Sequence, residues 1–443
     1  WPARTAAGLH VRTHQLEEEP CHVSETALDP NDYKTRDLPA GLRLIAGGVT
    51  AAPGFQAGTI ACGIKSEAGT PDMALLVADE TCAVAATFTT SRTPSHTVVV
   101  DKQHLAASGY RAGAVIVNSG NANCSNGARG NRDAQRMTEL AAQKLGIADS
   151  NLVLVSSTGI IGRPLPMDNV ERGIAEIQVG PDGGADFARG IMTTDTRPKL
   201  TAVEFELGGK TVRLGGSTKG VGMIYPNMAT MLCYLTTDVA LDPDFQRRVM
   251  RAAVNDSFNM VCVDGDMSTN DSAFLFANGH AGNVPVRAGT PAAETFETAL
   301  RYVTRYLARE MARDGEGASH LMTVHVVGAA TDTDARRAAR AVTASPLWQC
   351  AVAGGDPNWG RVVAALGASG AEIDHDRLDV AIGGVQIVRG GAAADYDQAQ
   401  AKLGMAGVDV VVDVDLHLGP YEATAWGCDL THGYIDENTT YTR

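Results

Sequence analysis

The sequence predicts a mixed α/β protein with a large lobe followed by a smaller one. Short apolar runs of strand length dominate from residue 54, amphipathic helical patterns interrupt them, and strands and helices alternate again after about residue 290. Only 5% of the 443 residues are aromatic, whereas 48 are glycine. The core is therefore expected to consist of small and aliphatic side chains with close backbone approaches.

The individual elements follow from local patterns. Strands are expected at 55–64, 74–78, 82–88, 98–100, 114–117, 152–155 and 231–235. Helices are expected at 133–145, 169–177, 187–192 and 296–311, and one more from the N-cap Asp242 with Pro243 to about residue 254. Gly208-Gly209 predicts a hairpin between 202–207 and 212–214. In the last third, strands and helices are expected among 321–327, 335–342, 348–353, 360–366, 378–382 and 408–416.

Composition excludes several classes of function. The formal net charge of −14 argues against a nucleic-acid partner. The sequence has no run of about 18 apolar residues, so no membrane span is predicted. The eight cysteines form no CxxC pair and mostly lie in apolar runs, which predicts reduced, buried thiols in a cytoplasmic protein. Residues 1–33 are expected to be a flexible polar extension. His10, His14, Cys21 and His22 lack a second half-site with ligand spacing, so no metal site is predicted there.

Common catalytic motifs do not occur in the sequence. There is no GxSxG, no HExxH and no complete P-loop, since Glu204 stands where the P-loop needs glycine. The usual pairs of nucleophile and base therefore give no signal, and the chemistry is expected to come from another arrangement.

The segment from Ser217 to Leu232, STKGVGMIYPNMATML, suits a nucleophile made by chain cleavage. If the Thr230 hydroxyl attacks the Ala229 carbonyl, an N→O acyl shift gives an ester, and hydrolysis frees the α-amine of Thr230. An α-amine has a pKa of about 7.7–8.0, so it can act as the base for its own hydroxyl. On the residues alone, the alternative is that Thr230 is simply a β-branched residue that starts a strand.

This segment resembles the cleavage motif of the ornithine acetyltransferase family, the bifunctional glutamate N-acetyltransferases of arginine biosynthesis. Further blocks resemble the family in the same order over about residues 50–443. These blocks are NSGNAN from Asn118, STGIIG from Ser157, MTTDT from Met192, DGDMSTND from Asp264, GEGA from Gly315, DPNWGR from Asp356 and GCDLT from Gly427.

The resemblance implies an αββα sandwich of two mixed sheets flanked by helices, with a smaller C-terminal α/β domain. Together with the local patterns, the expected organisation is an extension at 1–33, a main lobe at 34–290 and a smaller lobe with a tail that closes the active site at 291–443. Cleavage would give an α chain, 1–229, and a β chain, 230–443, and two or more αβ units would assemble. The implied reaction is ping-pong: N-acetylornithine acetylates Thr230, and glutamate takes the acetyl group. No cofactor is required, and acetyl-CoA can serve as a donor.

Residue roles follow from the same resemblance. Thr158 and Gly159 resemble the oxyanion hole, and Thr193, Lys219, Thr230, Glu316 and Asn438 resemble substrate-binding positions. Lys219 suits an α-carboxylate and Glu316 suits the ammonium group of ornithine.

Alternatives stay open, and three departures from the family pattern bear on the acceptor, one being that the first 34 or so residues have no counterpart in the common pattern. Arg443 stands where the family has a small hydroxyl residue, and Tyr225 replaces a smaller residue beside the cleavage loop. One alternative is a self-cleaving amidohydrolase or aminopeptidase of the same fold. The other is a paralogue of specialised metabolism that acetylates a related amine.

Overall fold

The computed structural model describes residues 33–225 and 231–440. The chain divides into two compact units, one ending at Leu38 and the other beginning at Pro39. The first contributes one short helix, α1 (Tyr33–Arg36), and the second contains all the remaining elements. The boundary between lobes at 34–290 and 291–443 stays a prediction. Residues 1–32, with the four candidate metal ligands, lie outside the described residues.

The first sheet of the second unit has nine strands in the order β1-β6-β7-β8-β10-β3-β4-β5, with β2 paired to β3. It is mixed, because β4 and β5 are parallel, as are β8 and β10, whereas the other pairs are antiparallel. Its strands are β1 (Leu42–Ile45), β2 (Phe55–Ile60), β3 (Met73–Phe88), β4 (Arg111–Asn121), β5 (Val153–Ile160), β6 (Lys199–Leu207), β7 (Lys210–Lys219), β8 (Leu232–Thr237) and β10 (Ser272–Ala277).

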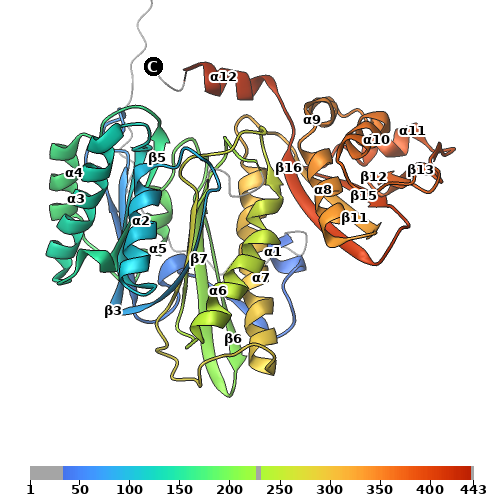
Figure 1. Cartoon of the computed structure of the whole chain (residues 1–443). Helices are drawn as coiled ribbons and strands as arrows, with labels where there is room; N and C mark the ends of the chain where they lie inside the picture. The colour runs from blue at the N-terminus through green and yellow to red at the C-terminus, as the bar shows by residue number, and fades with distance from the viewer. Residues whose placement is uncertain (1–32, 226–230, 441–443) are drawn as a thin grey trace, which may run out of the picture. The chain divides into compact units, whose positions relative to one another are not determined.

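Strand β3 joins two layers of this sheet. Its first half pairs with β2 and β4, its second half pairs with β10, and the pairing with β4 is irregular between Val77 and Cys82. One apolar cluster contains Leu76 and Leu154 from the first layer and Tyr234 and Phe274 from the second. The opposite face of the first layer packs against residues of the helices in a separate apolar cluster. The expected αββα sandwich is confirmed, with both layers continuous through β3 (Figure 1).

Helices cover the outer faces of both layers (Figure 1). On one side lie α2 (His96–Ala107), α3 (Gly127–Leu145) and α4 (Met167–Glu176), and on the other lie α6 (Pro243–Asn255) and α7 (Pro291–Arg313). Helix α5 (Gly184–Gly190) inserts Phe187 into the core between the layers. The stripe predicted for 296–311 is buried, because Phe296, Leu300, Val303, Leu307 and Met311 all face the sheet side.

The second sheet has seven strands in the order β14-β13-β12-β15-β11-β16-β9, and it is also mixed. Its strands are β9 (Val261–Cys262), β11 (Leu321–Ala329), β12 (Asp379–Ile382), β13 (Val385–Arg389), β14 (Ala392–Ala393), β15 (Asp409–Asp415) and β16 (Tyr421–Cys428). The helices that follow α7 are α8 (Asp332–Thr343), α9 (Pro346–Ala353), α10 (Trp359–Ala368), α11 (Gln398–Leu403) and α12 (His432–Thr440). Short 3₁₀ turns lie at η1 (Gly48–Thr50), η2 (Ser150–Leu152) and η3 (Phe258–Met260).

One predicted element is wrong. The β-branched run at 98–100 lies in helix α2, because the Ser95 side chain accepts a hydrogen bond from the Val98 N–H and caps the helix. The hairpin at Gly208-Gly209 is confirmed as β6 and β7, and Asp242 caps α6 as expected. Six of the eight cysteines are buried free thiols, while Cys350 is exposed.

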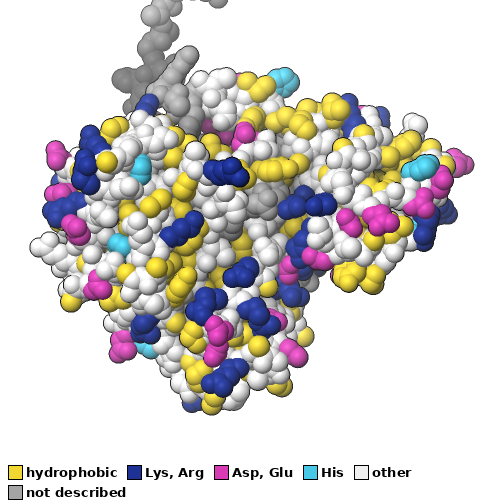
Figure 2. Space-filling model, viewed as in Figure 1, with side chains coloured by type: hydrophobic (Ala, Val, Ile, Leu, Met, Phe, Trp, Pro, Cys, Tyr) yellow, Lys and Arg dark blue, Asp and Glu magenta, His cyan; other side chains and the backbone are white. Residues whose placement is uncertain are grey.

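Acidic and basic side chains are interspersed with apolar ones on the face shown in Figure 2. Within the described parts of the chain, none of the helices combines the length and the apolar character needed to cross a membrane.

Candidate active site

Six residues singled out in the sequence line one cavity. Thr158 and Gly159 lie near the end of β5, Lys219 is the last residue of β7, and Thr193 lies in the loop after α5. Glu316 follows helix α7, and Asn438 lies in α12. The cavity therefore collects side chains from across the whole second unit. The predicted cleavage pair, Ala229 and Thr230, lies outside the described residues.

Lys219 is buried and holds two hydroxyl groups of the cavity. Its Nζ donates to Thr193 Oγ1 at 2.9 Å and to Thr158 Oγ1 at 3.2 Å. It also lies 4.0 Å from Asp195 Oδ2. Burial lowers the pKa of Lys219, while the Asp195 carboxylate acts in the opposite direction. The lysine is thus a buried ammonium group beside a buried carboxylate, and the Glu316 and Asp271 carboxylates also raise its pKa.

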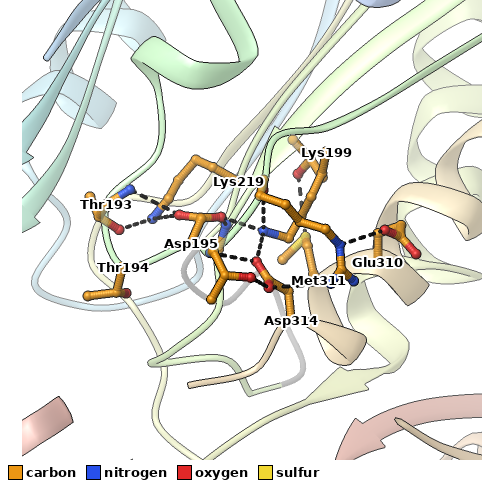
Figure 3. A network of polar contacts seen from close by, with 12 residues as sticks. Thr193, Thr194, Asp195, Lys199, Lys219, Glu310, Met311 and Asp314 are labelled. Carbon is orange, nitrogen blue, oxygen red and sulfur yellow. Dashed lines mark hydrogen bonds and ion pairs between the residues drawn. The ribbon is translucent and has the colours of Figure 1, made fainter. Parts of the chain in front are cut away.

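A buried network of ion pairs and hydrogen bonds contacts Thr193 and lies next to Lys219 (Figure 3). Asp195 Oδ1 accepts from Lys199 Nζ at 2.7 Å and from the Gly220 N–H at 2.9 Å, and Asp195 Oδ2 accepts from the Thr193 N–H at 3.0 Å. Lys199 also bonds to Asp314 at 2.6 Å. Although burial alone raises it, the pKa of Asp195 is held below its usual range by the Lys199 and Lys219 cations. Asp195 therefore fixes the backbone on both sides of the Lys219 ammonium.

The contact with Lys219 determines how the Thr158 hydroxyl can act. An ammonium group only donates hydrogen bonds, so Thr158 Oγ1 is the acceptor in this contact. The hydroxyl hydrogen is then available to an acceptor in the cavity. A donor beside a buried cation is the kind of group that stabilises a developing oxyanion.

Gly159 has the backbone conformation that its position demands. Its φ of +129° is in the region that favours glycine. A Cβ atom there would overlap the carbonyl carbon of Gly120 on the neighbouring strand β4. Position 159 in β5 therefore cannot take any other residue type without a shift of the backbone.

Glu316 also lines the cavity. Its carboxylate accepts from Thr194 Oγ1 at 2.7 Å and from Asn438 Nδ2 at 2.8 Å. A Cβ at Gly222 would lie 2.5 Å from Glu316 Cδ, so the glycine allows the carboxylate to approach the chain that follows Lys219. Asn438 also donates to the Tyr434 carbonyl at 3.0 Å, one turn earlier in α12. The C-terminal helix is thereby attached to the wall of the site.

Sequence reasoning missed two buried carboxylates. Asp195 and Asp271 lie inside the quoted motif blocks, but neither was given a role. Asp271 Oδ1 accepts from the Met231 N–H at 2.8 Å, and the side chain is fully buried. Burial raises the pKa of Asp271, and the hydrogen bond from Met231 opposes that effect. An acidic residue directly before strand β10, which is apolar after its first residue, Ser272, is the signal that could have identified it.

No cation site lies in this cavity among the residues described. The group that could hold a metal ion, Asp374, His375 and Asp376, is exposed and does not line the cavity. The described polar side chains that line the cavity are five hydroxyl groups, two amides, one ammonium and one carboxylate, from Thr158, Thr193, Thr194, Ser268, Thr269, Asn270, Asn438, Lys219 and Glu316.

Comparison with known proteins gives the family. Residues 56–443 match the model of the ArgJ family. The chain is 49% identical over 400 residues to the "Arginine biosynthesis bifunctional protein ArgJ" of Symbiobacterium thermophilum, covering 90% of this chain and 99% of the relative. It is 46% identical over 389 residues to the protein of the same name from Thermus thermophilus, covering 88% and 98%.

A solved structure is also similar, that of ornithine acetyltransferase complexed with ornithine from Mycobacterium tuberculosis. It is 36% identical, covers 42% of this chain and 98% of its own, and has a TM-score of 0.38. The chain belongs to the ArgJ family. The resemblance read from the motifs is confirmed, as is the predicted enzyme class, an acyltransferase of arginine biosynthesis.

Proposed function

We propose that the chain cleaves itself between Ala229 and Thr230 and then moves an acetyl group from N-acetylornithine to glutamate. The observation that carries this proposal is the convergence of Thr158, Gly159, Lys219 and Glu316 on one cavity. Such a cavity offers donors for an oxyanion, a cation for a carboxylate and an anion for an ammonium group. These are the charges that an N-acylated diamino acid presents during acyl transfer.

In the first half-reaction, the Thr230 hydroxyl attacks the acetyl carbonyl of N-acetylornithine. The freed α-amine of Thr230 takes the hydroxyl proton and returns it to the leaving amine, so ornithine departs and an acetyl ester remains. The Thr158 hydroxyl and the Gly159 N–H donate to the oxygen of the tetrahedral intermediate. Lys219, which holds Thr158 and Thr193, keeps this donor oriented and faces the α-carboxylate.

In the second half-reaction, the amine of glutamate attacks the ester and N-acetylglutamate leaves. The reaction exchanges one amide for another through an ester, so it needs no cofactor. Acetyl-CoA acetylates the same threonine when it serves as the donor. Glu316, held by Thr194 and Asn438, faces the side-chain ammonium of ornithine. The cleaved α and β chains stay together, and two or more αβ units assemble.

Denaturing gel electrophoresis tests the cleavage. The folded protein should run as two fragments divided after Ala229, Thr230→Ala should stay uncut and inactive, and Thr230→Ser should retain partial cutting because its hydroxyl remains. A Thr230→Ala variant that still matured and transferred acetyl groups would falsify the assignment of the nucleophile.

An assay with a panel of amino-acid acceptors tests the transfer. N-acetylornithine should donate its acetyl group to glutamate faster than to water or to other amines. Release of acetate that no acceptor suppresses would instead identify a hydrolase of the same fold. Preference for a different amine would identify a paralogue with another acceptor.

A further inference from the structure

A second cavity adjoins the candidate active site. Thr193 lines both cavities, and the second continues past Gly120 and Ile160 to the side chains of Lys65 and Arg163. Its described lining includes one acidic residue, the exposed Glu67 at the rim. The two cavities therefore meet at Thr193, and the second has two basic residues, Lys65 and Arg163, in its lining.

The backbone that carries Lys65 is held in a fixed shape. The buried carboxylate of Asp72 accepts hydrogen bonds from the N–H groups of Cys62, Gly63, Ile64 and Lys65, at 2.8, 2.9, 2.6 and 3.1 Å. Four donors on one carboxylate organise this turn before any ligand arrives. The Lys65 side chain is thus presented by a rigid loop.

Lys65 keeps donors for a ligand. Among the described residues its ammonium makes one hydrogen bond, to the Pro71 carbonyl at 2.7 Å, and an ammonium has three N–H groups. Burial lowers the pKa of Lys65, and the nearby Lys219 cation lowers it further, while Asp72 opposes both effects. The carboxylates of Asp195 and Glu67 also raise this pKa, and the remaining N–H groups of the Lys65 ammonium are the donors that a ligand carboxylate can use.

Packing ties this lysine to the proposed oxyanion hole. A Cβ at Gly120 would lie 2.8 Å from Lys65 Cγ, so the lysine stem passes directly over this glycine. Gly120 in turn pairs with Gly159 across β4 and β5. The backbone of Arg163 is also held, because the side-chain amides of Asn121 and Asn126 donate to its carbonyl oxygen at 3.1 and 2.9 Å.

We propose that Lys65, with Arg163 at the mouth, binds the side-chain carboxylate of the acidic acceptor amino acid. This inference rests on the proposed function. The α-carboxylate of the acceptor faces Lys219, its side chain passes Thr193, and its second carboxylate reaches Lys65. Ornithine, whose side chain is cationic, instead turns toward Glu316. The two substrates thus react at the same position, but their side chains occupy different parts of the site. One site can therefore bind side chains of opposite charge.

The test compares acceptor kinetics in Lys65→Met, which keeps an apolar stem over Gly120 but removes the charge. With N-acetylornithine as donor, the KM for glutamate should rise about 10- to 100-fold, as for loss of a charge-assisted hydrogen bond. The preference for glutamate over the neutral acceptor glutamine should fall by a similar factor. Lys65→Arg should recover most of this preference. Lys210→Met, the same change at an exposed lysine at the other end of β7, serves as the control.

A second readout separates this inference from the proposed function. Exchange of labelled ornithine into N-acetylornithine needs only the first half-reaction. In Lys65→Met, the factor by which the exchange rate falls should therefore be at least tenfold smaller than the factor by which the rate of transfer to glutamate falls. A KM for glutamate within twofold of the original overturns the inference. So does a rise in the KM for acetyl-CoA with the glutamate KM unchanged, because Lys65 and Arg163 would then bind a phosphate-bearing donor. Absence of the exchange reaction in the unaltered protein overturns the proposed function instead.

Discussion

The ammonium group of Lys219 donates a hydrogen bond to the hydroxyl oxygen of Thr158 at 3.2 Å, and both side chains are buried. The contact makes Thr158 an acceptor toward the lysine and leaves its hydrogen for the cavity. The same lysine holds Thr193 at 2.9 Å. One cation thereby orients two hydroxyl groups around the position proposed for the reacting carbonyl.

Replacement of Thr158 tests how much its hydroxyl group contributes to the rate as a donor to the oxyanion. Thr158→Val keeps the shape of the side chain but removes the hydroxyl, so kcat should fall about 10²- to 10³-fold, the usual cost of one such donor. Thr158→Ser, which keeps the hydroxyl, should lose far less. Steady-state transfer kinetics check both variants. Equal rates for the valine and serine variants would show that the hydroxyl does not face the transition state.

The pH profile should be bell-shaped. Activity should rise as the Thr230 α-amine loses its proton, near its ordinary pKa of about 7.7–8.0. It should fall again as Lys219 becomes neutral, and because burial lowers the pKa of Lys219, that fall should come below the ordinary lysine value of about 10.4. Lys219→Gln should lose most activity, and its residual rate should lack the alkaline fall. An unchanged alkaline limb in this variant would assign that limb to another group.

Gly159 in β5 and Gly162 in the turn that follows allow the effect of backbone conformation to be measured separately from that of a close contact. Gly159 and Gly162 both have positive φ, at +129° and +80°, but only at Gly159 would a Cβ overlap the neighbouring strand. Gly162→Ala should therefore cost about 1–2 kcal/mol of stability, whereas Gly159→Ala should cost more and abolish transfer. Denaturant unfolding and acetyl-transfer rates measure both effects. Similar losses in the two variants would contradict the close approach of Gly120.

Asp271 should control self-cleavage through the residue that follows Thr230. Its carboxylate accepts the Met231 N–H at 2.8 Å, so Asp271→Ala leaves a buried donor without its partner, at a cost of about 1–3 kcal/mol. The half-time of cleavage should lengthen about tenfold for a loss of this size. Asp266→Ala, at an exposed carboxylate of the same loop, should cleave normally. The fraction of uncut chain on a denaturing gel, followed after synthesis, gives the comparison. Cleavage of Asp271→Ala at the original rate would remove this role.

Local patterns were sufficient for much of the fold. The stripe of α7, the cap of α6 and the Gly208-Gly209 turn depend on neighbouring residues, and each is found as predicted. The run at 98–100 was misassigned, because its β-branched composition was outweighed by the Ser95 cap and by packing of the helix.

Several residues of the candidate site could be predicted from the sequence, but the contacts between them could not. Long motifs identified Thr158, Lys219, Glu316 and Asn438, and these side chains meet in one cavity. Their partners could not be predicted, because each contact joins distant parts of the chain. Asn438 bonds to Glu316 across 122 positions, and Thr158 bonds to Lys219 across 61. Only the packing of α12 and of strands β5 and β7 brings such pairs together.

The mass of the denatured protein after incubation with N-acetylornithine alone tests the central claim most directly. We expect two fragments, 1–229 and 230–443, with one acetyl group on the fragment that begins at Thr230 and none on the other. Addition of glutamate should remove that acetyl group. An active protein that remains a single uncut chain, or one that carries the acetyl group at any other residue, would contradict the claim.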